Sequence, residues 1–247
     1  MANDNGYDTY SSSIEPVITL KGVHRIYHLA GEDIHAVNNV TLDVWPRHMT
    51  AIVGRSGSGK TTLLNLIAGL DEPTGGEIWV LGRSLAHMDE RERLDLRLNQ
   101  LGFVFQSFGL MPLLTARENV GVPLRMRGMS PKEREARIDE ALAWVGLSDR
   151  AHHRPYELSG GEQQRVAIAR AIVSDPAAVL ADEPTANLDS QTGAQVMDLM
   201  RRLNEEHCVI FIVVTHDPAV TRYARRTIRI LDGRLMEGGD DEVVDPT

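Results

Sequence analysis

Short apolar runs alternate along the chain with longer segments in which apolar residues recur at helical spacing. The runs at residues 17–20, 40–44 and 50–53 have the length of strands, and residues 61–69 follow with helical spacing and a closing glycine. Strand-length and helical segments that alternate in this way are typical of a mainly parallel sheet covered by helices. The pattern therefore predicts an α/β fold.

Further apolar runs extend the predicted sheet along the rest of the chain. Strands are expected at residues 77–81, 101–105, 178–181 and 209–214. A dipeptide typical of a tight hairpin turn, Asp232-Gly233, then separates two last short runs. We therefore expect a hairpin at the end of the domain.

The middle of the chain is charged and helical. Ser130 and the proline after it open a run that carries Ile138, Leu142 and Val145 on one face, with charged residues elsewhere. We interpret this part of the chain, about residues 107–165, as a helical subdomain inserted into the core.

The two ends differ from the single domain between them, residues 14–236. Residues 1–13 are rich in Asn, Asp and Ser and lack the basic start and apolar stretch of a secretory signal, so we expect them to be disordered. Residues 237–247 form an acidic tail that we expect to be solvated.

The composition restricts the compartment and the partners. The longest uninterrupted apolar run, residues 208–214, is far shorter than the roughly 20 residues of a bilayer span, so the chain is not expected to cross a membrane. The only cysteine, Cys208, lies in that strand-like run, which excludes an intramolecular disulfide and a cysteine-based zinc site and favours a reducing cytoplasm. A net charge of −9 disfavours nucleic acid as a partner, because such binding needs Lys and Arg to neutralise phosphates.

A glycine-rich segment between a predicted strand and a predicted helix matches the pattern G-x-x-x-x-G-K-[ST]. Its residues are Gly54, Arg55, Ser56, Gly57, Ser58, Gly59, Lys60 and Thr61. In such a loop, backbone N–H groups converge on phosphate oxygens, the lysine reaches the β and γ phosphates, and the hydroxyl of Thr61 can ligate Mg²⁺. We include the adjacent Thr62 among the expected nucleotide contacts. The alternative is a glycine-rich turn without a ligand.

Two carboxylates end the apolar run at residues 178–181. An acid at the carboxyl end of a central strand lies beside the phosphate loop, where Asp182 can hold the Mg²⁺ shell and Glu183 can orient and activate water. The alternative is a strand that ends in surface acids.

A second glycine-containing segment precedes another predicted helix. It consists of Ser159, Gly160, Gly161 and Glu162, after Leu158. A hydroxyl and free N–H groups at a helix N-terminus form an anion site, although for this segment taken alone a capped helix with a loose glycine entry is the commoner explanation. Two phosphate sites with one copy each suggest that two chains share ATP.

These motifs together resemble those of the ATP-binding cassette (ABC) family. Residues 158–162 resemble the signature sequence of that family. The resemblance implies a P-loop NTPase core of the ABC ATPase type, with an inserted helical subdomain and an N-terminal antiparallel β portion. Gln106 matches the family's Q-loop glutamine, Asp189 its D-loop aspartate, His216 its switch histidine, and Tyr27 the aromatic residue that stacks on adenine. Taken alone, His216 reads as a polar strand end and Tyr27 as a packing residue.

The resemblance also implies how such a protein works. ATP and Mg²⁺ are the implied cofactors, with Thr61, Gln106 and Asp182 near the metal, and Glu183, His216 and Gln106 in catalysis. Two copies meet head to tail, each ATP lies between the phosphate loop of one chain and residues 159–162 of the other, and hydrolysis lets them part.

Three less specific segments, residues 31–37, 101–106 and 114–120, resemble the group that contains MacB, LolD and FtsE. That resemblance implies a separate MacB/LolD/FtsX-like integral membrane permease, beneath which the chain sits at the cytoplasmic face of the plasma (inner) membrane, for export or mechanical work on a lipoprotein, drug or peptide. The alternative is a soluble single-cassette ABC ATPase in cofactor assembly. The apolar stretch at residues 108–114 is expected either to contact the permease or to form the core of the helical subdomain.

Overall fold

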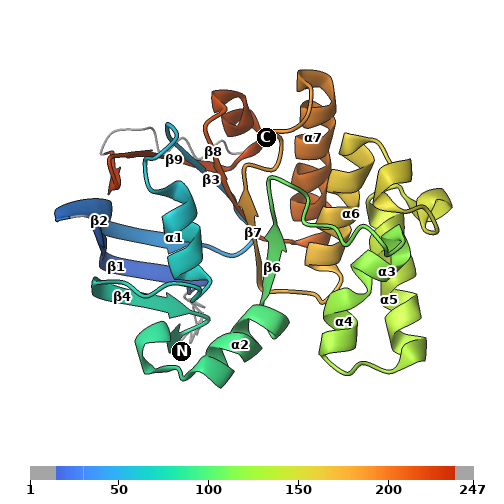
Figure 1. Ribbon diagram of the computed structural model, residues 1–247, viewed down its shortest axis with the longest axis horizontal. Coiled ribbons are helices and arrows are strands. Elements are labelled where there is room, and N and C mark those ends of the chain that lie inside the picture. The colour runs from blue at the N-terminus through green and yellow to red at the C-terminus, as the bar shows by residue number, and fades with distance from the viewer. Residues whose placement is uncertain (1–14, 30, 237–247) are drawn as a thin grey trace, which may run out of the picture.

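The computed structural model describes residues 15–29 and 31–236, so the predictions for the start and the tail of the chain lie outside it. The described chain contains two sheets with helices packed around them (Figure 1). No helix in these residues is long and apolar enough to cross a membrane.

A six-stranded sheet forms the centre of the molecule, and its strand order is β10-β9-β3-β8-β7-β6. The strands are β3 (Met49–Val53), β6 (Leu101–Val104), β7 (Ala178–Asp182), β8 (Phe211–Thr215), β9 (Arg226–Leu231) and β10 (Arg234–Leu235). They pair in parallel except for β10, which forms a hairpin with β9. The carboxyl ends of the parallel strands therefore meet at one edge of the sheet, where ligands of such folds bind.

A four-stranded antiparallel sheet, in the order β2-β1-β4-β5, lies beside the central sheet. Its strands are β1 (Ile18–Leu29), β2 (Glu32–Val44), β4 (Gly75–Val80) and β5 (Arg83–Ser84). Helix α1 (Lys60–Ile67) packs between this sheet and the central one (Figure 1). The predicted α/β fold with an N-terminal antiparallel portion is thus confirmed.

Both faces of the central sheet are covered, because successive strand residues point to opposite sides. Ile212 and Val214 pack with α1 and the antiparallel sheet, whereas Phe211 and Val213 pack against α6 (Gly160–Ile172) and α7 (Ser190–His207). The near-continuous apolar runs of β7 and β8 reflect this burial on both faces.

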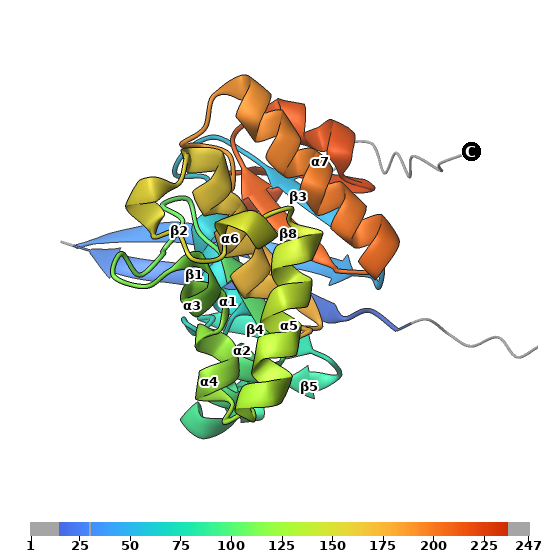
Figure 2. The same ribbon diagram turned by 90° about the vertical axis from the view of Figure 1, so that its right-hand side faces the viewer.

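The charged middle of the chain forms helices on the far side of α6. They are α3 (Ala116–Val120), α4 (Val122–Met126) and α5 (Pro131–Trp144). Figure 2 shows these helices grouped in front of the sheet, with α4 and α5 side by side. Ile138, Leu142 and Val145 are buried, as their helical spacing predicts.

Three features differ from the sequence-based expectations. The first two strands are 12 and 13 residues long rather than short, and they form a hairpin whose tip is exposed. Helices α2 (Glu90–Asn99) and α7 were not predicted. Cys208 lies outside the strand: it is an exposed residue in the left-handed conformation at the end of α7, and β8 begins only at Phe211.

Candidate functional site

The phosphate loop lies at the carboxyl end of β3, between β8 and β9 in the centre of the sheet. The N–H of Gly54 donates to the carbonyl of Thr215 at 3.1 Å, which ties the loop to β8. Gly59 has φ 98°, and a Cβ there would lie 2.0 Å from the carbonyl oxygen of Ala36 in β2. This position therefore requires glycine for both its conformation and its contact with the hairpin.

Lys60 opens helix α1 and is almost fully buried. Its ammonium donates to the carbonyls of Gly54 at 2.8 Å and Arg55 at 3.0 Å, and its Nζ lies 3.7 Å from Oε1 of Glu183. The first N–H groups of a helix have no partner within it, so α1 directs donors and its positive dipole end at the same place as this cation. The loop and helix together suit a polyphosphate.

A cavity of about 670 Å³ opens above the loop. Predicted site residues that line it are Arg55, Ser56, Gly57, Gly59, Lys60, Thr61, Thr62, Gln106, Asp182, Glu183 and His216. The hairpin of the antiparallel sheet adds Ile34, His35 and Ala36, which the motif did not identify as site residues. Two residues of the loop, Gly54 and Ser58, do not line the cavity. Ser58 is buried, and a Cβ on Gly54 would lie 2.4 Å from the carbonyl oxygen of Ile230.

Asp182 ends β7 beside the first turn of α1. The hydroxyl of Thr61 donates to its Oδ2 at 3.0 Å, while its buried Oδ1 has no hydrogen-bond partner. Burial raises the pKa of Asp182; the hydrogen bond from Thr61 partly offsets this, and the negative charge of Glu183 adds to it. A hard cation that takes oxygen ligands would satisfy the unpartnered oxygen.

The residues present therefore fit Mg²⁺. Within residues 15–29 and 31–236 no group of three or more His, Cys, Asp or Glu side chains forms an all-protein metal site. Mg²⁺ commonly takes only one or two protein ligands together with phosphate oxygens and waters, which matches the single pair of Thr61 and Asp182.

Glu183 follows Asp182 in the left-handed conformation, with φ 47°. Its N–H donates to the carbonyl of Val214 at 2.9 Å, and its Oε2 accepts from the N–H of His216 at 3.2 Å. The neighbouring strand end thus holds a carboxylate over the cavity, where its largely buried oxygens face the phosphate loop. A left-handed conformation at a bulky residue is uncommon and persists only where surrounding contacts enforce it.

Gln106 reaches the cavity from the loop after β6. Its carbonyl accepts from Nδ2 of Asn187 at 2.9 Å, so the segment before α7 holds the loop from one side. The structure thereby brings Gln106 together with Asp182, Glu183 and His216.

Tyr27 does not line the cavity. Its hydroxyl donates to Oδ2 of Asp71 at 2.7 Å, and the guanidinium of Arg25 lies 4.5 Å from the ring centroid. It pairs across the hairpin with Ile34, which does line the cavity, so the two side chains share one face. A role of Tyr27 beside adenine stays a prediction.

Ser159 caps helix α6 and is engaged with Glu162. Oε2 of Glu162 accepts from the N–H and the hydroxyl of Ser159, both at 2.8 Å, and these bonds hold the pKa of the carboxyl below its usual range. Nε of Arg150 lies 3.3 Å from Oε1 of Glu162. None of residues 159–162 lines the cavity.

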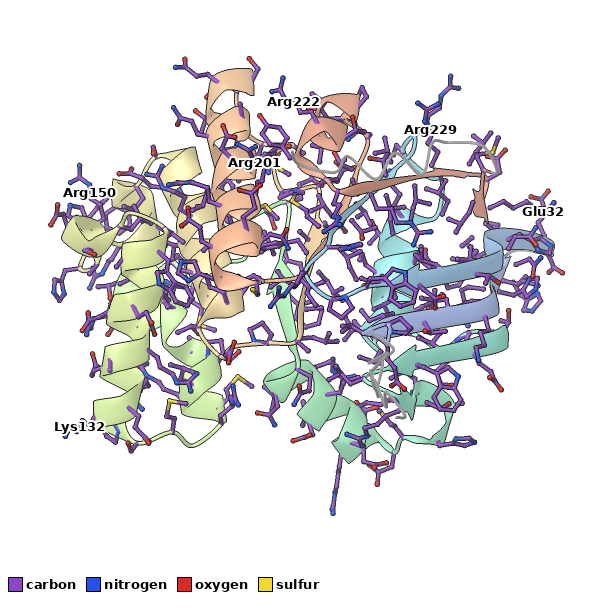
Figure 3. The ribbon with its side chains drawn as sticks, turned by 180° about the vertical axis from the view of Figure 1, so that it is seen from behind. Glu32, Lys132, Arg150, Arg201, Arg222 and Arg229 are labelled. Atoms are coloured by element: carbon purple, nitrogen blue, oxygen red, sulfur yellow. The ribbon has the colours of Figure 1, made fainter. Side chains whose placement is uncertain are left out.

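The two glycines of this segment pack against the start of α7. A Cβ on Gly161 would lie 2.4 Å from Cγ2 of Thr192, and one on Gly160 would lie 3.2 Å from Leu188. Figure 3 shows Arg150, the ion partner of Glu162, and Glu32, at the start of β2, on opposite flanks of the molecule. The ion partner of the signature segment therefore lies on the opposite flank from the hairpin that borders the cavity.

Asp189 caps α7 in the same region. Its Oδ1 accepts from the N–H groups of Gln191 at 3.1 Å and Thr192 at 3.0 Å, and the bonds with Thr192 are the main cause of its lowered pKa. It lines a separate hollow of about 130 Å³ together with Asp217 and Tyr223. The structure does not bring Asp189 to the phosphate loop of its own chain.

A phosphate loop at a central parallel strand, carboxylates at the end of β7 and an added antiparallel sheet define a P-loop ATPase of the ABC type. Residues 37–186 match the family described as ABC transporter. The lipoprotein-releasing system ATP-binding protein LolD of Chromohalobacter salexigens is 46% identical over 90% of this chain and 94% of its own length. The chain belongs to the ABC transporter ATP-binding family, and it is an ATPase.

Two further relatives extend the comparison. The macrolide export ATP-binding/permease protein MacB of Marinobacter nauticus is 44% identical over 91% of this chain, which corresponds to 35% of MacB. The cassette MJ0796 of Methanocaldococcus jannaschii, solved as a post-hydrolysis dimer with ADP and phosphate, has a TM-score of 0.80 at 44% identity and matches over 89% of this chain and 97% of its own. The sequence-based recognition of the family is confirmed.

Proposed function

We propose that the cavity binds ATP with Mg²⁺ and that Glu183 activates the water that attacks the γ-phosphate. The observation that carries this proposal is the pairing of a partly buried carboxylate with the ammonium of Lys60 on one side and His216 on the other. When bound, Mg²⁺ neutralises charge that develops on the phosphates. Thr61 and Asp182, with Gln106 beside them in the cavity, would hold the ion there, while the N–H groups of the phosphate loop and α1 would bind the phosphate oxygens.

The second half of each nucleotide site comes from another copy of the chain. Residues 159–162 carry a hydroxyl and helix N–H groups but lie outside the cavity. In a head-to-tail dimer they meet the γ-phosphate held by the partner subunit, and Asp189 lies at the same interface. The dimeric state of the MJ0796 cassette supports this arrangement.

The partner that the chain drives is an integral membrane permease of the MacB/LolD/FtsX kind, which places the chain at the cytoplasmic face of the membrane. The relatives named LolD and MacB favour this partner over a soluble role in cofactor assembly. MacB carries ATP-binding and permease parts in one protein, as its name states, and this chain corresponds to about a third of it.

A groove beside α4 is the candidate contact with the permease. A hollow of about 210 Å³ is lined by Phe105, Gly109 and Met126, among others. Phe105, Met126, Met111 and Leu113 are exposed apolar side chains, and Leu113 is 81% exposed. Leu110, by contrast, packs against the core, which agrees with the other role expected for residues 108–114. Phe105 and Met126 line the hollow together, and contiguous exposed apolar residues typically mark an interaction surface.

The test is capture of a membrane partner. Tagged protein carrying Glu183→Gln is incubated with ATP, Mg²⁺ and detergent-solubilised membranes of the native organism, and bound proteins are identified by mass spectrometry. We expect a permease with a large extracytoplasmic domain. A matched variant carries Met126→Asp in addition, which places a charge in the groove and should prevent capture while ATP binding persists. Recovery of soluble proteins alone would favour the assembly role instead.

A further inference from the structure

The loop that carries Gln106 has an unusual backbone. Phe108 and Gly109 both adopt the left-handed conformation, with φ 61° and 60°. Glycine does so at no cost, whereas a bulky side chain such as that of Phe108 does so only when its surroundings enforce it. Some contact must therefore hold this part of the loop.

Arg170 of α6 supplies that contact. Its Nη2 donates to the carbonyl of Phe108 at 2.9 Å, and its Nη1 donates to the carbonyl of Gly109. A Cβ on Gly109 would lie 3.4 Å from Nη2 and 3.2 Å from the ring of Phe105. The two left-handed residues thus present consecutive carbonyl oxygens to the fork of one guanidinium, a geometry that arginine suits and lysine does not.

The charged guanidinium of Arg170 forms its hydrogen bonds with these two carbonyls. Among the residues that the structure describes, no carboxylate forms an ion pair with it, and burial lowers the pKa of its guanidinium. A partly buried cation without a counter-charge needs strong hydrogen-bond acceptors. Here the only acceptors that it bonds in the described chain are main-chain atoms of the Gln106 loop.

Gln106 is consequently held from two elements. Asn187, before α7, binds the carbonyl of Gln106 itself, and Arg170 binds the loop two and three residues further on. Arg170 lies on the same helix whose first residues follow Ser159. A shift of α6 along its axis would therefore be carried directly into the loop.

We propose that Arg170 is a positioning residue for Gln106, which fixes the loop so that the glutamine enters the nucleotide cavity and follows the position of helix α6. The proposal rests on the role proposed for Gln106 in hydrolysis. It differs from a purely structural role, in which Arg170 would stabilise the fold and affect nucleotide binding and turnover together.

The test is a double-mutant cycle on ATPase activity with Arg170→Met and Gln106→Ala. We expect Arg170→Met to lower kcat by about tenfold or more, since small misplacements of a reacting group are costly, while the Kd for ATP stays nearly unchanged. In the Gln106→Ala background the same substitution should change kcat by less than about twofold, because the group it positions is gone.

The matched control is Arg127→Met. Arg127 of the adjoining region also donates to a main-chain carbonyl, that of Ser174 at 2.6 Å, but it does not contact the Gln106 loop. Its substitution should leave kcat unchanged. If Arg170→Met does not fold, the cycle is run with Arg170→Lys, which keeps the positive charge but loses the forked guanidinium. We then expect a smaller decrease in kcat, and only in the protein that retains Gln106.

An equal drop in both backgrounds, or a parallel loss of ATP affinity, would overturn the proposal. If the single variant Gln106→Ala has an unchanged kcat, both the proposal for Arg170 and the role assigned to Gln106 would be overturned. The proposed ATPase mechanism is tested separately, because Glu183 has no contact with Arg170. Normal turnover in Glu183→Gln would contradict that mechanism.

Discussion

Oε2 of Glu183 lies 2.9 Å from Nδ1 of His216 and accepts a hydrogen bond from the main-chain N–H of the same histidine. The two residues come from neighbouring strand ends, β7 and β8, so the parallel pairing of these strands places them together. A carboxylate oriented by a histidine is a geometry suited to a general base.

The first prediction concerns this carboxylate. Glu183→Gln should lower kcat by about 10²–10⁴-fold, because the group that accepts the proton of the attacking water is lost. The Kd for ATP should change little, since Lys60, Thr61 and Asp182 remain. Single-turnover hydrolysis and nucleotide titration measure the two quantities, and Glu205→Gln on the exposed part of α7 is the control. Near-normal turnover would show that Glu183 is not the base.

The second prediction concerns the signature segment. Ser159→Arg should abolish ATP-dependent dimerisation, because a bulky side chain replaces the hydroxyl at the cap of α6. Monomers should still bind ATP, since Ser159 lies outside the cavity. Size-exclusion chromatography with ATP, in the Glu183→Gln background that retains the nucleotide, measures the dimer. A normal dimer would place the segment away from the partner's nucleotide.

The third prediction concerns the phosphate loop. Gly59→Ala should weaken ATP binding by tenfold or more, as its Cβ would lie 2.0 Å from a carbonyl oxygen of β2 and the loop would have to move. Gly146→Ala is the control: its φ is also positive, but nothing lies within 4 Å of the added atom. It should cost about 1–2 kcal/mol of unfolding free energy and leave ATP affinity unchanged. Equal ATP affinities for the two variants would contradict the prediction.

The fourth prediction concerns the cap of α3 and its dependence on pH. Glu118 accepts from the N–H of Thr115 at 2.8 Å and from its hydroxyl at 3.0 Å, and these bonds lower the pKa of Glu118 from its ordinary value of 4.5. A carboxyl whose pKa is lower in the folded state stabilises the fold above its unfolded pKa, and this contribution is lost as the pH falls through the folded pKa.

Glu118→Ala should therefore lower the free energy of unfolding by about 1 kcal/mol at pH 7. The difference from the unmodified protein should shrink as the pH falls below 4.5. Urea unfolding at a series of pH values measures it, with the exposed Glu140→Ala as control. A difference that stays constant through the acid range would refute the link to the ionised cap.

Much of the site could be predicted because each motif is local. The phosphate loop needs its glycines and lysine at fixed spacing, and Asp182 and Glu183 directly follow an apolar strand. Ile34, His35 and Ala36 could not be assigned to the cavity from the motif, because the hairpin approaches it through tertiary packing. Arg170 carried no local signal either, since its partners lie about sixty residues earlier in the chain.

The fold was predictable where burial dominates and less so elsewhere. The ends of β1 and β2 that form the exposed hairpin tip lack an apolar pattern and were missed. Helix α2 is rich in charged residues and buries only Leu96, which explains why it gave little periodic signal. The apolar run at residues 208–214 crosses an element boundary, because the sharp left-handed turn at Cys208 is made by the backbone rather than by polarity.

The placement of Ser159 outside the cavity of its own chain has a consequence for mixtures of defective proteins. In the proposed head-to-tail dimer, chains that all lack Lys60 would give only nucleotide sites with a damaged phosphate loop, and chains that all lack Ser159 would give only sites with a damaged signature segment. When the two preparations are mixed, a hybrid dimer of this kind would carry both defects in one site, and the other site would have an intact phosphate loop and an intact signature segment. Two inactive preparations should thus complement each other, which a protein with self-contained sites would not allow.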